Sequence, residues 1–207
     1  MKGKWTTLTV AVAAVLLTVI SSFAAGNVLF EDKFATLDPA WAAPSEWINV
    51  KDGKLIINGE KNLADNYLNQ GAILPNDMDA SVNMTFIKAA DINYGSGLLF
   101  WAKDYNGWYC ALINADGWFA VQRRVGDRFL MPVNWIKSDA IKKGAGVENQ
   151  FRVVTKGSQA TVYINGKQVI SFSGQAPEGG SLIGFRVGSG PKESNSVAFS
   201  DLKVVAP

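Results

Sequence analysis

The 207-residue sequence contains no histidine and only one cysteine, Cys110. Without histidine the chain cannot build a Ser-His-Asp or Cys-His catalytic site, a histidine general base or a zinc site with histidine ligands. With one cysteine it cannot form an intrachain disulfide. Any catalysis would therefore rest on carboxylates, lysine, tyrosine or an oxygen-ligated cation, and an apolar core must hold the fold together.

The sequence also has little charge, and no large surplus of either sign. Charged residues make up 18% and apolar residues 48%, a composition that excludes a disordered chain. The formal net charge is +2, and it falls to zero when Lys2 and Lys4 are removed, because 18 basic and 18 acidic residues remain. With no basic surplus to neutralise phosphates, we expect no nucleic-acid partner.

The N-terminus has the pattern of a secretory signal peptide. Lys2 and Lys4 precede an apolar run over residues 8–20, and Ser22-Phe23-Ala24 fits a small-x-small cleavage site. The run is short for a spanning helix, which needs about 20 apolar residues. We therefore predict a signal peptide over 1–24, a single domain over 25–207 and an exported protein, periplasmic or secreted, with no membrane span in the mature chain. An uncleaved anchor is the alternative.

Short apolar runs separated by tight turns predict an all-β fold. No segment has a convincing helical period, whereas Asn-Gly and Asp-Gly pairs, which favour two-residue hairpin turns, stand at 52–53, 106–107, 116–117 and 165–166. Alternation is clearest over 78–88. We expect residues 61–69 to be irregular, 70–74 to be a strand and 132–135 to be coil. About a dozen strands without a disulfide imply two packed antiparallel sheets, with the closing strand beside the opening one.

The stretch 95–124 predicts a three-stranded meander that could present a ligand-binding face. With two-residue loops at both turns, directly opposed residues share a face, and Lys103 would face Cys110, which would face Arg123. This register places aromatic and polar side chains on one solvent-facing surface. The candidate ligand-binding residues are Trp101, Lys103, Tyr105, Trp108, Asn114, Arg123 and, from a later segment, Trp135.

In this hypothesis the tryptophans stack against sugar rings while Lys103, Asn114 and Arg123 bind hydroxyl groups. The alternative is that the tryptophans fill the core and the charged residues form a solvated rim. Tyr105 could clamp a ligand or simply pair with Trp108 at the hairpin end. Cys110 is interpreted as a small buried residue, although neighbouring Lys103 and Arg123 could lower its pKa.

Carboxylates offer little support for hydrolysis or for metal binding. Asp104 and Asp116 lie at turns, so a catalytic pair would have to come from loop residues such as Asp65, Asp91 or Asp104. Glu31 and Asp201 lie on the first and last predicted strands and could share a structural calcium ion. Calcium takes six to eight oxygen ligands, so a solvated pair of acids is the alternative. No other cofactor is expected.

Four stretches resemble the concanavalin A-like lectin/glucanase superfamily: LFEDKFATLDPAW with EWINVKDGKL, GLLFWAKDYNGWYCALINADGWFAVQRR, NQFRVVTKGSQATVYINGKQVISF and SVAFSDLKVV. Within it the chain is most similar to bacterial secreted 3-keto-disaccharide hydrolase-like, or laminin-G-like, domains. The resemblance implies a two-sheet jelly roll whose concave sheet binds carbohydrate. The chain departs from the pattern in lacking the Glu-x-Asp-x-x-Glu run of retaining glucanases and in carrying Trp101 where related domains have arginine.

The sequence therefore favours an exported, lectin-like carbohydrate-binding module without catalytic activity. A glycoside hydrolase of the related family and an envelope adhesion or structural module are the alternatives. The oligomeric state is open.

Overall fold

The computed structural model describes residues 26–89 and 93–207. The predicted signal peptide, residues 1–24, and the candidate carboxylate Asp91 lie outside the described residues. The strands are β1 (Val28–Asp32), β2 (Ile48–Lys51), β3 (Lys54–Asn58), β4 (Ala64–Leu68), β5 (Met78–Lys88), β6 (Ser96–Asp104), β7 (Gly107–Ile113), β8 (Trp118–Val125), β9 (Arg128–Lys137), β10 (Glu148–Lys156), β11 (Gln159–Ile164), β12 (Lys167–Ser173), β13 (Leu182–Gly188) and β14 (Ser196–Val205).

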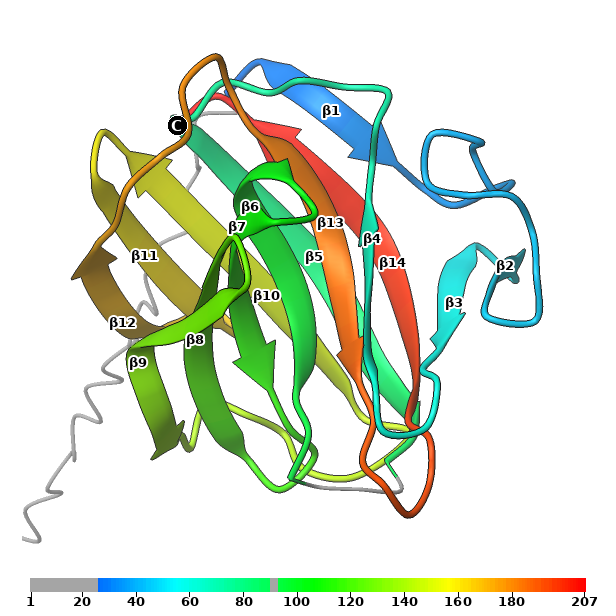
Figure 1. The fold of residues 1–207 in the computed structure, drawn as a ribbon. Helices are drawn as coiled ribbons and strands as arrows, with labels where there is room; N and C mark the ends of the chain where they lie inside the picture. Colours follow the sequence, from blue (N-terminus) through cyan, green and yellow to red (C-terminus); the bar gives the residue numbers. More distant parts are fainter. Residues whose placement is uncertain (1–25, 90–92) are drawn as a thin grey trace, which may run out of the picture.

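These strands form two antiparallel sheets packed face to face, as the sequence predicted (Figure 1). One sheet has the order β12-β11-β10-β5-β14-β3-β2, with β1 also paired to β14. The other has the order β4-β13-β6-β7-β8-β9. The pairing of β1 with β14 confirms that the closing strand returns beside the opening one. No helix in the described part of the chain is long and apolar enough to cross a membrane.

Two of the four predicted tight hairpins have the expected geometry. Asp52 and Gly53 have φ angles of 52° and 70°, and Asn165 and Gly166 have φ angles of 51° and 78°. Two successive positive values are what a type I′ turn requires. The predicted strand over 78–88 is also confirmed, and its inward-facing residues Met78, Ala80, Val82, Met84 and Phe86 are all buried.

The β6–β7 hairpin differs from the prediction because β6 contains a bulge. Its two-residue turn is Tyr105-Asn106, since Asp104 pairs with Gly107 and the Asp104 carboxylate accepts the Asn106 N–H at 2.7 Å. Phe100 pairs with Tyr109, so residues 101–103 stand opposite Trp108 alone. The extra residues break the alternation of side chains, as β-bulges do.

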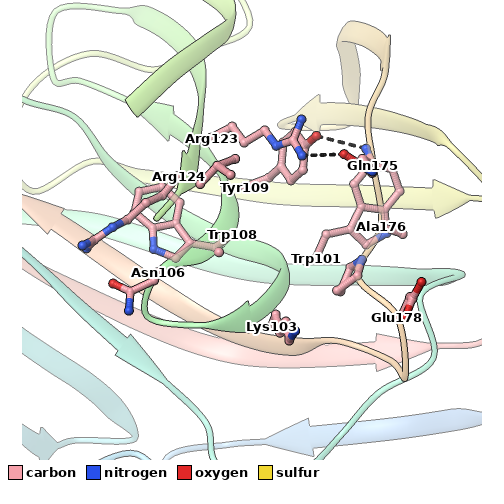
Figure 2. Close-up of a pocket in the computed structure, with 13 residues that line it drawn as sticks. Trp101, Lys103, Asn106, Trp108, Tyr109, Arg123, Arg124, Gln175, Ala176 and Glu178 are labelled. Carbon is pink, nitrogen blue, oxygen red and sulfur yellow. Dashed lines mark hydrogen bonds between the residues drawn. The ribbon is translucent and has the colours of Figure 1, made fainter. Parts of the chain in front are cut away.

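The bulge turns Trp101 into the core. Trp101 has a φ angle of +44°, unusual for a bulky residue, and its side chain is 2% exposed. Its Nε1–H donates to the Asn76 carbonyl at 3.0 Å, and its ring packs edge-on against Tyr109. Figure 2 places the indole beside Ala176, away from Trp108. The prediction that Trp101 and Trp108 share a solvent-facing surface is therefore wrong.

The β7–β8 register is also one residue away from the prediction, because the Asn114 side chain lengthens the turn. Its Oδ1 accepts the N–H groups of Asp116 at 3.1 Å and Trp118 at 2.9 Å. Gly117 takes a φ of +87°, which fits a three-residue loop. Arg123 consequently pairs with Tyr109 rather than with Cys110. The shift moves Arg123 to the inner side of the sheet and Trp118 to the outer side.

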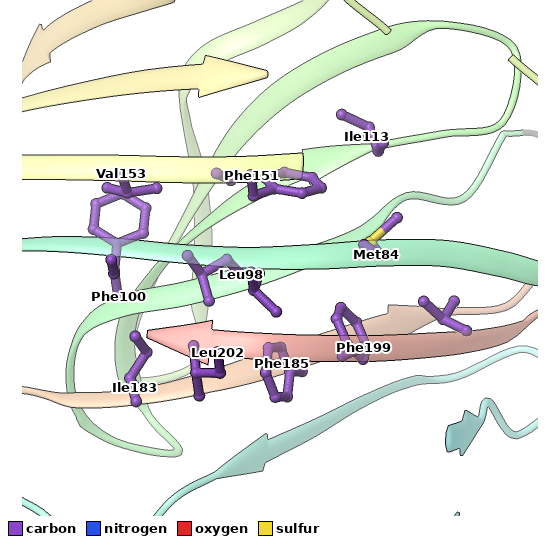
Figure 3. Packing of buried hydrophobic residues seen from close by; sticks show 14 of the residues in the cluster. Met84, Leu98, Phe100, Ile113, Phe151, Val153, Ile183, Phe185, Phe199 and Leu202 are labelled. Carbon is purple, nitrogen blue, oxygen red and sulfur yellow. The ribbon is translucent and has the colours of Figure 1, made fainter. Parts of the chain in front are cut away.

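The main core lies between the two sheets and contains most of the large apolar side chains (Figure 3). Phe185 of β13 stacks on Phe199 of β14 with ring centroids 4.1 Å apart, and so links the two layers. Trp41, from the loop after β1, stacks on Phe185 at 5.1 Å. The apolar burial provides the stability that a chain without an intrachain disulfide needs.

Three local predictions were wrong at the sheet edges. Residues 64–68, expected to be irregular, form β4, a half-polar edge strand paired with β13. Residues 132–135 belong to β9, where Pro132 is tolerated because β9 is an edge strand. Of the predicted strand at 70–74, only an isolated bridge between Leu74 and Ser181 is present.

Candidate functional site

The surface that collects polar and aromatic groups is the outer face of the six-stranded sheet, turned away from the main core. We call it the outer face. A second, smaller apolar cluster forms its floor and contains Leu99, Trp108, Cys110 and Leu112. Because alternate residues share a side of a strand, Trp118, Gln122 and Arg124 lie on the same face.

One end of the outer face carries a cavity of about 260 Å³, which we call the tryptophan pocket. Its walls are Asn93, Asn114, Trp118 and Trp135. Both indoles are half-buried, so each keeps part of its ring surface accessible. The Lys137 ammonium lies 5.3 Å from the Trp118 ring centroid. Two aromatic walls and two amide side chains form a common arrangement for binding a polar ring with apolar C–H surfaces.

Gly95 fixes the position of Trp135 in this pocket. A Cβ at residue 95 would lie 2.5 Å from Cη2 of the Trp135 ring, closer than real contacts allow. It would also lie 3.1 Å from the Ile113 carbonyl oxygen. Only glycine therefore leaves room for the indole to rest on β6 and β7.

The middle of the outer face is apolar, with one polar atom of note. The buried Oε1 of Gln122 has no hydrogen-bond partner among the described residues. Its cross-strand neighbour Cys110 is fully buried, as predicted. Burial raises the pKa of the Cys110 thiol to about 12, although the nearby positive charge of Arg186 acts in the opposite direction. The thiol is therefore not activated by neighbouring cations, which corrects the suggestion that Lys103 and Arg123 could lower its pKa.

At the other end of the outer face, two arginine side chains stack on aromatic rings. The Arg186 Cζ atom lies 5.0 Å from the Trp108 ring centroid and 5.8 Å from that of Phe129. The Arg124 Cζ atom lies 5.4 Å from the same Phe129 ring. Arg186 Nη1–H donates to the Asn66 side-chain oxygen at 2.8 Å. Desolvation by burial lowers the pKa of Arg186 from its ordinary value.

Beside these arginines is a cavity of about 250 Å³ at the bulged end of the β6–β7 hairpin, which we call the hairpin pocket (Figure 2). The bulge opens it, because β6 and β7 part after Phe100 and Tyr109. Arg123 closes the inner side: its Nη2–H donates to Gln175 Oε1 at 2.8 Å, and its guanidinium lies over the Tyr109 ring. The charged residues that line the hairpin pocket are Lys103, Arg123, Arg124 and Glu178.

The predicted ligand-binding residues thus divide into two groups. Trp101, Lys103, Trp108 and Arg123 line the hairpin pocket, whereas Asn114 and Trp135 line the tryptophan pocket. Trp101 and Trp108 are nearly inaccessible, so neither offers a free ring face. Tyr105 lines neither pocket; its hydroxyl accepts the Leu68 N–H at 3.4 Å and ties the hairpin tip to β4.

Sequence reasoning missed Trp118, Gln122, Arg124 and Arg186. The first three follow from the register of the β7–β8 turn. An asparagine three residues before Gly117 was the available signal for a longer loop. Arg186 carried no local signal, because it reaches the outer face only through the pairing of β13 with β6.

The candidate calcium ligands Glu31 and Asp201 lie on either side of a lysine. Lys33 Nζ lies 3.1 Å from Glu31 Oε1 and 3.3 Å from Asp201 Oδ1, and the two acids raise the pKa of Lys33. Within residues 26–89 and 93–207, no group of three or more acidic or cysteine side chains is arranged to hold a metal ion. Bound calcium stays an untested prediction, and the observed contacts favour a lysine-bridged pair of acids.

The loop carboxylates considered for catalysis have structural hydrogen bonds. Asp65 Oδ2 accepts the Glu60 N–H at 2.8 Å, and Asp104 Oδ1 closes the β6–β7 turn. Glu178 is the one acidic residue in the lining of either pocket among the described residues.

Comparisons with known proteins support the fold. No protein-family model matches the sequence, and no curated protein matches it. Among solved structures, the carbohydrate-binding module CBM66 from Bacillus subtilis is 12% identical, with 86% of this chain and 97% of that chain covered and a TM-score of 0.52. The Emp47p carbohydrate recognition domain is 12% identical, with 88% and 94% covered and a TM-score of 0.61.

A structure from work on endo-acting O-glycanases of the human gut microbiota is 13% identical, with 87% of this chain and 100% of that chain covered and a TM-score of 0.62. At these identities the likeness concerns the fold alone. The fold is that of the concanavalin A-like jelly rolls, as the resemblance implied. The finer likeness to 3-keto-disaccharide hydrolase-like domains stays a prediction.

Proposed function

We propose that this protein is an exported, lectin-like carbohydrate-binding module that holds a glycan on its outer face without cleaving it. The exported form would begin after the predicted signal peptide. The architecture leaves the question of binding or cleavage open, because carbohydrate-binding and hydrolytic proteins have similar folds. The proposal therefore rests on the chemistry of the outer face.

The tryptophan pocket is the observation that carries the proposal. Trp118 and Trp135 come from neighbouring strands and keep part of their ring surfaces accessible around a cavity of about 260 Å³. Sugar rings have apolar C–H faces that stack on indoles and hydroxyl groups that bind amides. The side chains of Asn93 and Asn114 form the remaining walls.

The distribution of carboxylates supports binding rather than hydrolysis. Hydrolysis of a glycosidic bond usually needs two carboxyl groups, about 5–5.5 Å apart for retention or roughly 6.5–9.5 Å apart for inversion. Among the described residues, Glu178 is the only acid that lines the hairpin pocket, and none lines the tryptophan pocket. Without histidine, a second acid or base would have to be a lysine or a tyrosine, and glycoside hydrolysis uses such residues only exceptionally.

The test is a glycan-array screen of residues 25–207, followed by titration of the best oligosaccharide. Trp118→Ala and Trp135→Ala should each weaken binding by about tenfold or more, since a stacked aromatic contributes roughly 0.5–1.5 kcal/mol beyond its buried area. Trp47→Ala is the matched control, because Trp47 is 40% exposed and lies before β2, outside the outer face. The control should bind like the wild type.

Three outcomes would contradict the proposal. Absence of any glycan ligand would favour an adhesion or structural module instead. Equal losses in Trp47→Ala and Trp118→Ala would place binding elsewhere. Turnover of glycosides or 3-keto-glycosides, measured with and without chelator, would establish the hydrolase alternative.

A further inference from the structure

Three cations in and beside the hairpin pocket have no acidic partner among the described residues. The salt bridges among the described residues involve Lys33, Lys88 and Arg152, all outside the outer face. Lys103 and Arg124 line the hairpin pocket and Arg186 stacks on Trp108 in its wall, and none is within 4.0 Å of a carboxylate of a described residue. Such a group of unpaired cations attracts an anion from outside the chain.

Arg186 is the most informative of the three. It is only 9% exposed, yet of its five N–H donors a single one has a hydrogen-bond acceptor among residues 26–89 and 93–207, the Asn66 side chain. The charged or titratable groups that influence it are Cys110, Arg124 and Asp65. Cys110 is protonated, Arg124 repels it, and Asp65 forms no ion pair with it. A buried charge without a counterion is costly, and a bound anion would offset that cost.

We propose that this end of the outer face binds an acidic group on the glycan, a carboxylate or sulfate held in the hairpin pocket by Lys103 and Arg124. The inference rests on the proposed function and names the ligand class: an acidic rather than a neutral oligosaccharide. Arg186, which stacks on the Trp108 ring in the pocket wall, adds positive potential beside the pocket. Arginine pairs with planar oxyanions through its fork of donors, and lysine acts as a point charge.

The contacts of the two pocket cations leave them available for this role. Arg124 uses its Nε–H for the Gly126 carbonyl at 2.9 Å, so its terminal nitrogens keep their donors. Lys103 is exposed and makes no hydrogen bond or ion pair with any described residue. The single acid in the pocket wall, Glu178, faces three cationic wall residues, so positive charge prevails.

The experiment compares acidic polymers with their neutral counterparts. Polygalacturonate is compared with its methyl ester for the carboxylate, and dextran sulfate with dextran for the sulfate. Wild-type protein should bind at least one acidic member about tenfold or more tightly than its neutral counterpart, and added salt should weaken that binding. The two pairs distinguish a carboxylated from a sulfated ligand.

Lys103→Gln and Arg124→Gln should each lower affinity for the acidic polymer by about tenfold while leaving the unfolding temperature nearly unchanged. Lys167→Gln removes the same charge from β12 of the other sheet and should have no effect. Equal loss in Lys167→Gln, or no loss in Lys103→Gln and Arg124→Gln, would overturn the inference.

Equal affinity for an acidic polymer and its neutral counterpart would also overturn the inference and leave the proposed function intact. Failure to bind any acidic or neutral glycan would overturn both.

Discussion

Replacing Gly95 with alanine tests whether the tryptophan pocket has the geometry described. The new Cβ would lie 2.5 Å from Trp135 Cη2, 3.1 Å from the Ile113 carbonyl oxygen and 3.2 Å from Leu112 Cβ. The backbone of Gly95 has no positive φ, so alanine introduces no backbone strain there. The change therefore acts through steric contact, and it removes no atom that could touch a ligand.

The loss of unfolding free energy in Gly95→Ala depends on which neighbour of the new methyl group can move. Overpacking costs typically about 1–3 kcal/mol. Trp135 is half-buried and meets the new methyl group with the far end of its ring, so the indole can swing outward. We therefore expect the free energy of unfolding to fall by about 1 kcal/mol, at the low end of that range, while Trp135 leaves its position. Glycan affinity should fall as far as it does in Trp135→Ala.

Urea denaturation of four proteins provides the assay: wild type, Gly95→Ala, Trp135→Leu and the double variant. Because leucine is too short to reach the new methyl group, the double variant should be about 1 kcal/mol more stable than the two single effects predict by addition. Gly107→Ala is the matched control, since its Cβ would meet nothing closer than 3.8 Å. It should unfold at about the wild-type urea concentration.

Strict additivity in this cycle would refute the contact between residues 95 and 135. Wild-type glycan affinity in Gly95→Ala would show that the position of Trp135 does not matter for binding.

Four further results are expected. Trp101→Ala should lower the free energy of unfolding by about 3–5 kcal/mol, because its ring is 2% exposed in the core; unchanged stability with lost glycan affinity would make the indole a ligand contact. A thiol reagent should label Cys110 only after unfolding. Because the folded thiol has a pKa of about 12 and an unfolded thiol about 8.5, wild-type stability should fall between these pH values more steeply than that of Cys110→Ala; rapid labelling of folded protein would disprove burial. Calcium and chelator should leave the unfolding temperature unchanged because Lys33 already bridges Glu31 and Asp201; a calcium-dependent rise abolished by Glu31→Gln would establish the metal site.

The architecture could be predicted because local signals agreed with one another. The type I′ turns at Asp52-Gly53 and Asn165-Gly166 and the alternation over β5 depend on a few neighbouring residues. Such signals identify strands and some of their turns. The number of strands, together with the lack of a disulfide, implied two packed sheets with the closing strand beside the opening one, and β1 and β14 are neighbours.

The candidate site was harder to predict, because a shift of one residue along a strand moves each side chain to the opposite face of the sheet. The bulge at residues 101–103 turns Trp101 inward, although the side chains of β7 keep their predicted faces. The longer turn capped by Asn114 moves β8 by one residue, so the side chains of β8 exchange faces. Trp101 was therefore expected in solvent and lies in the core, whereas Trp118, which was not among the predicted ligand-binding residues, lies on the outer face. An Asn-Gly pair does not by itself reveal that the turn begins one residue earlier.

The edge strands β4 and β9 were also difficult to predict from the sequence. The segment of β4 is half polar and the segment of β9 contains Pro132, so both have weak strand propensity. Pairing with β13 and β8 overrides that propensity. The position of Arg186 depends on the same long-range pairing, which no local pattern encodes.

The most direct test of the proposed glycan-binding face is a titration that follows the indole N–H signals of residues 25–207 by ¹H–¹⁵N NMR. On addition of the best oligosaccharide from the array, the signals of Trp118 and Trp135 should move together and saturably. The signals of Trp41 and Trp101, whose rings lie in the main core, should stay in place. Saturable shifts at Trp47 with none at Trp118 and Trp135 would contradict the account.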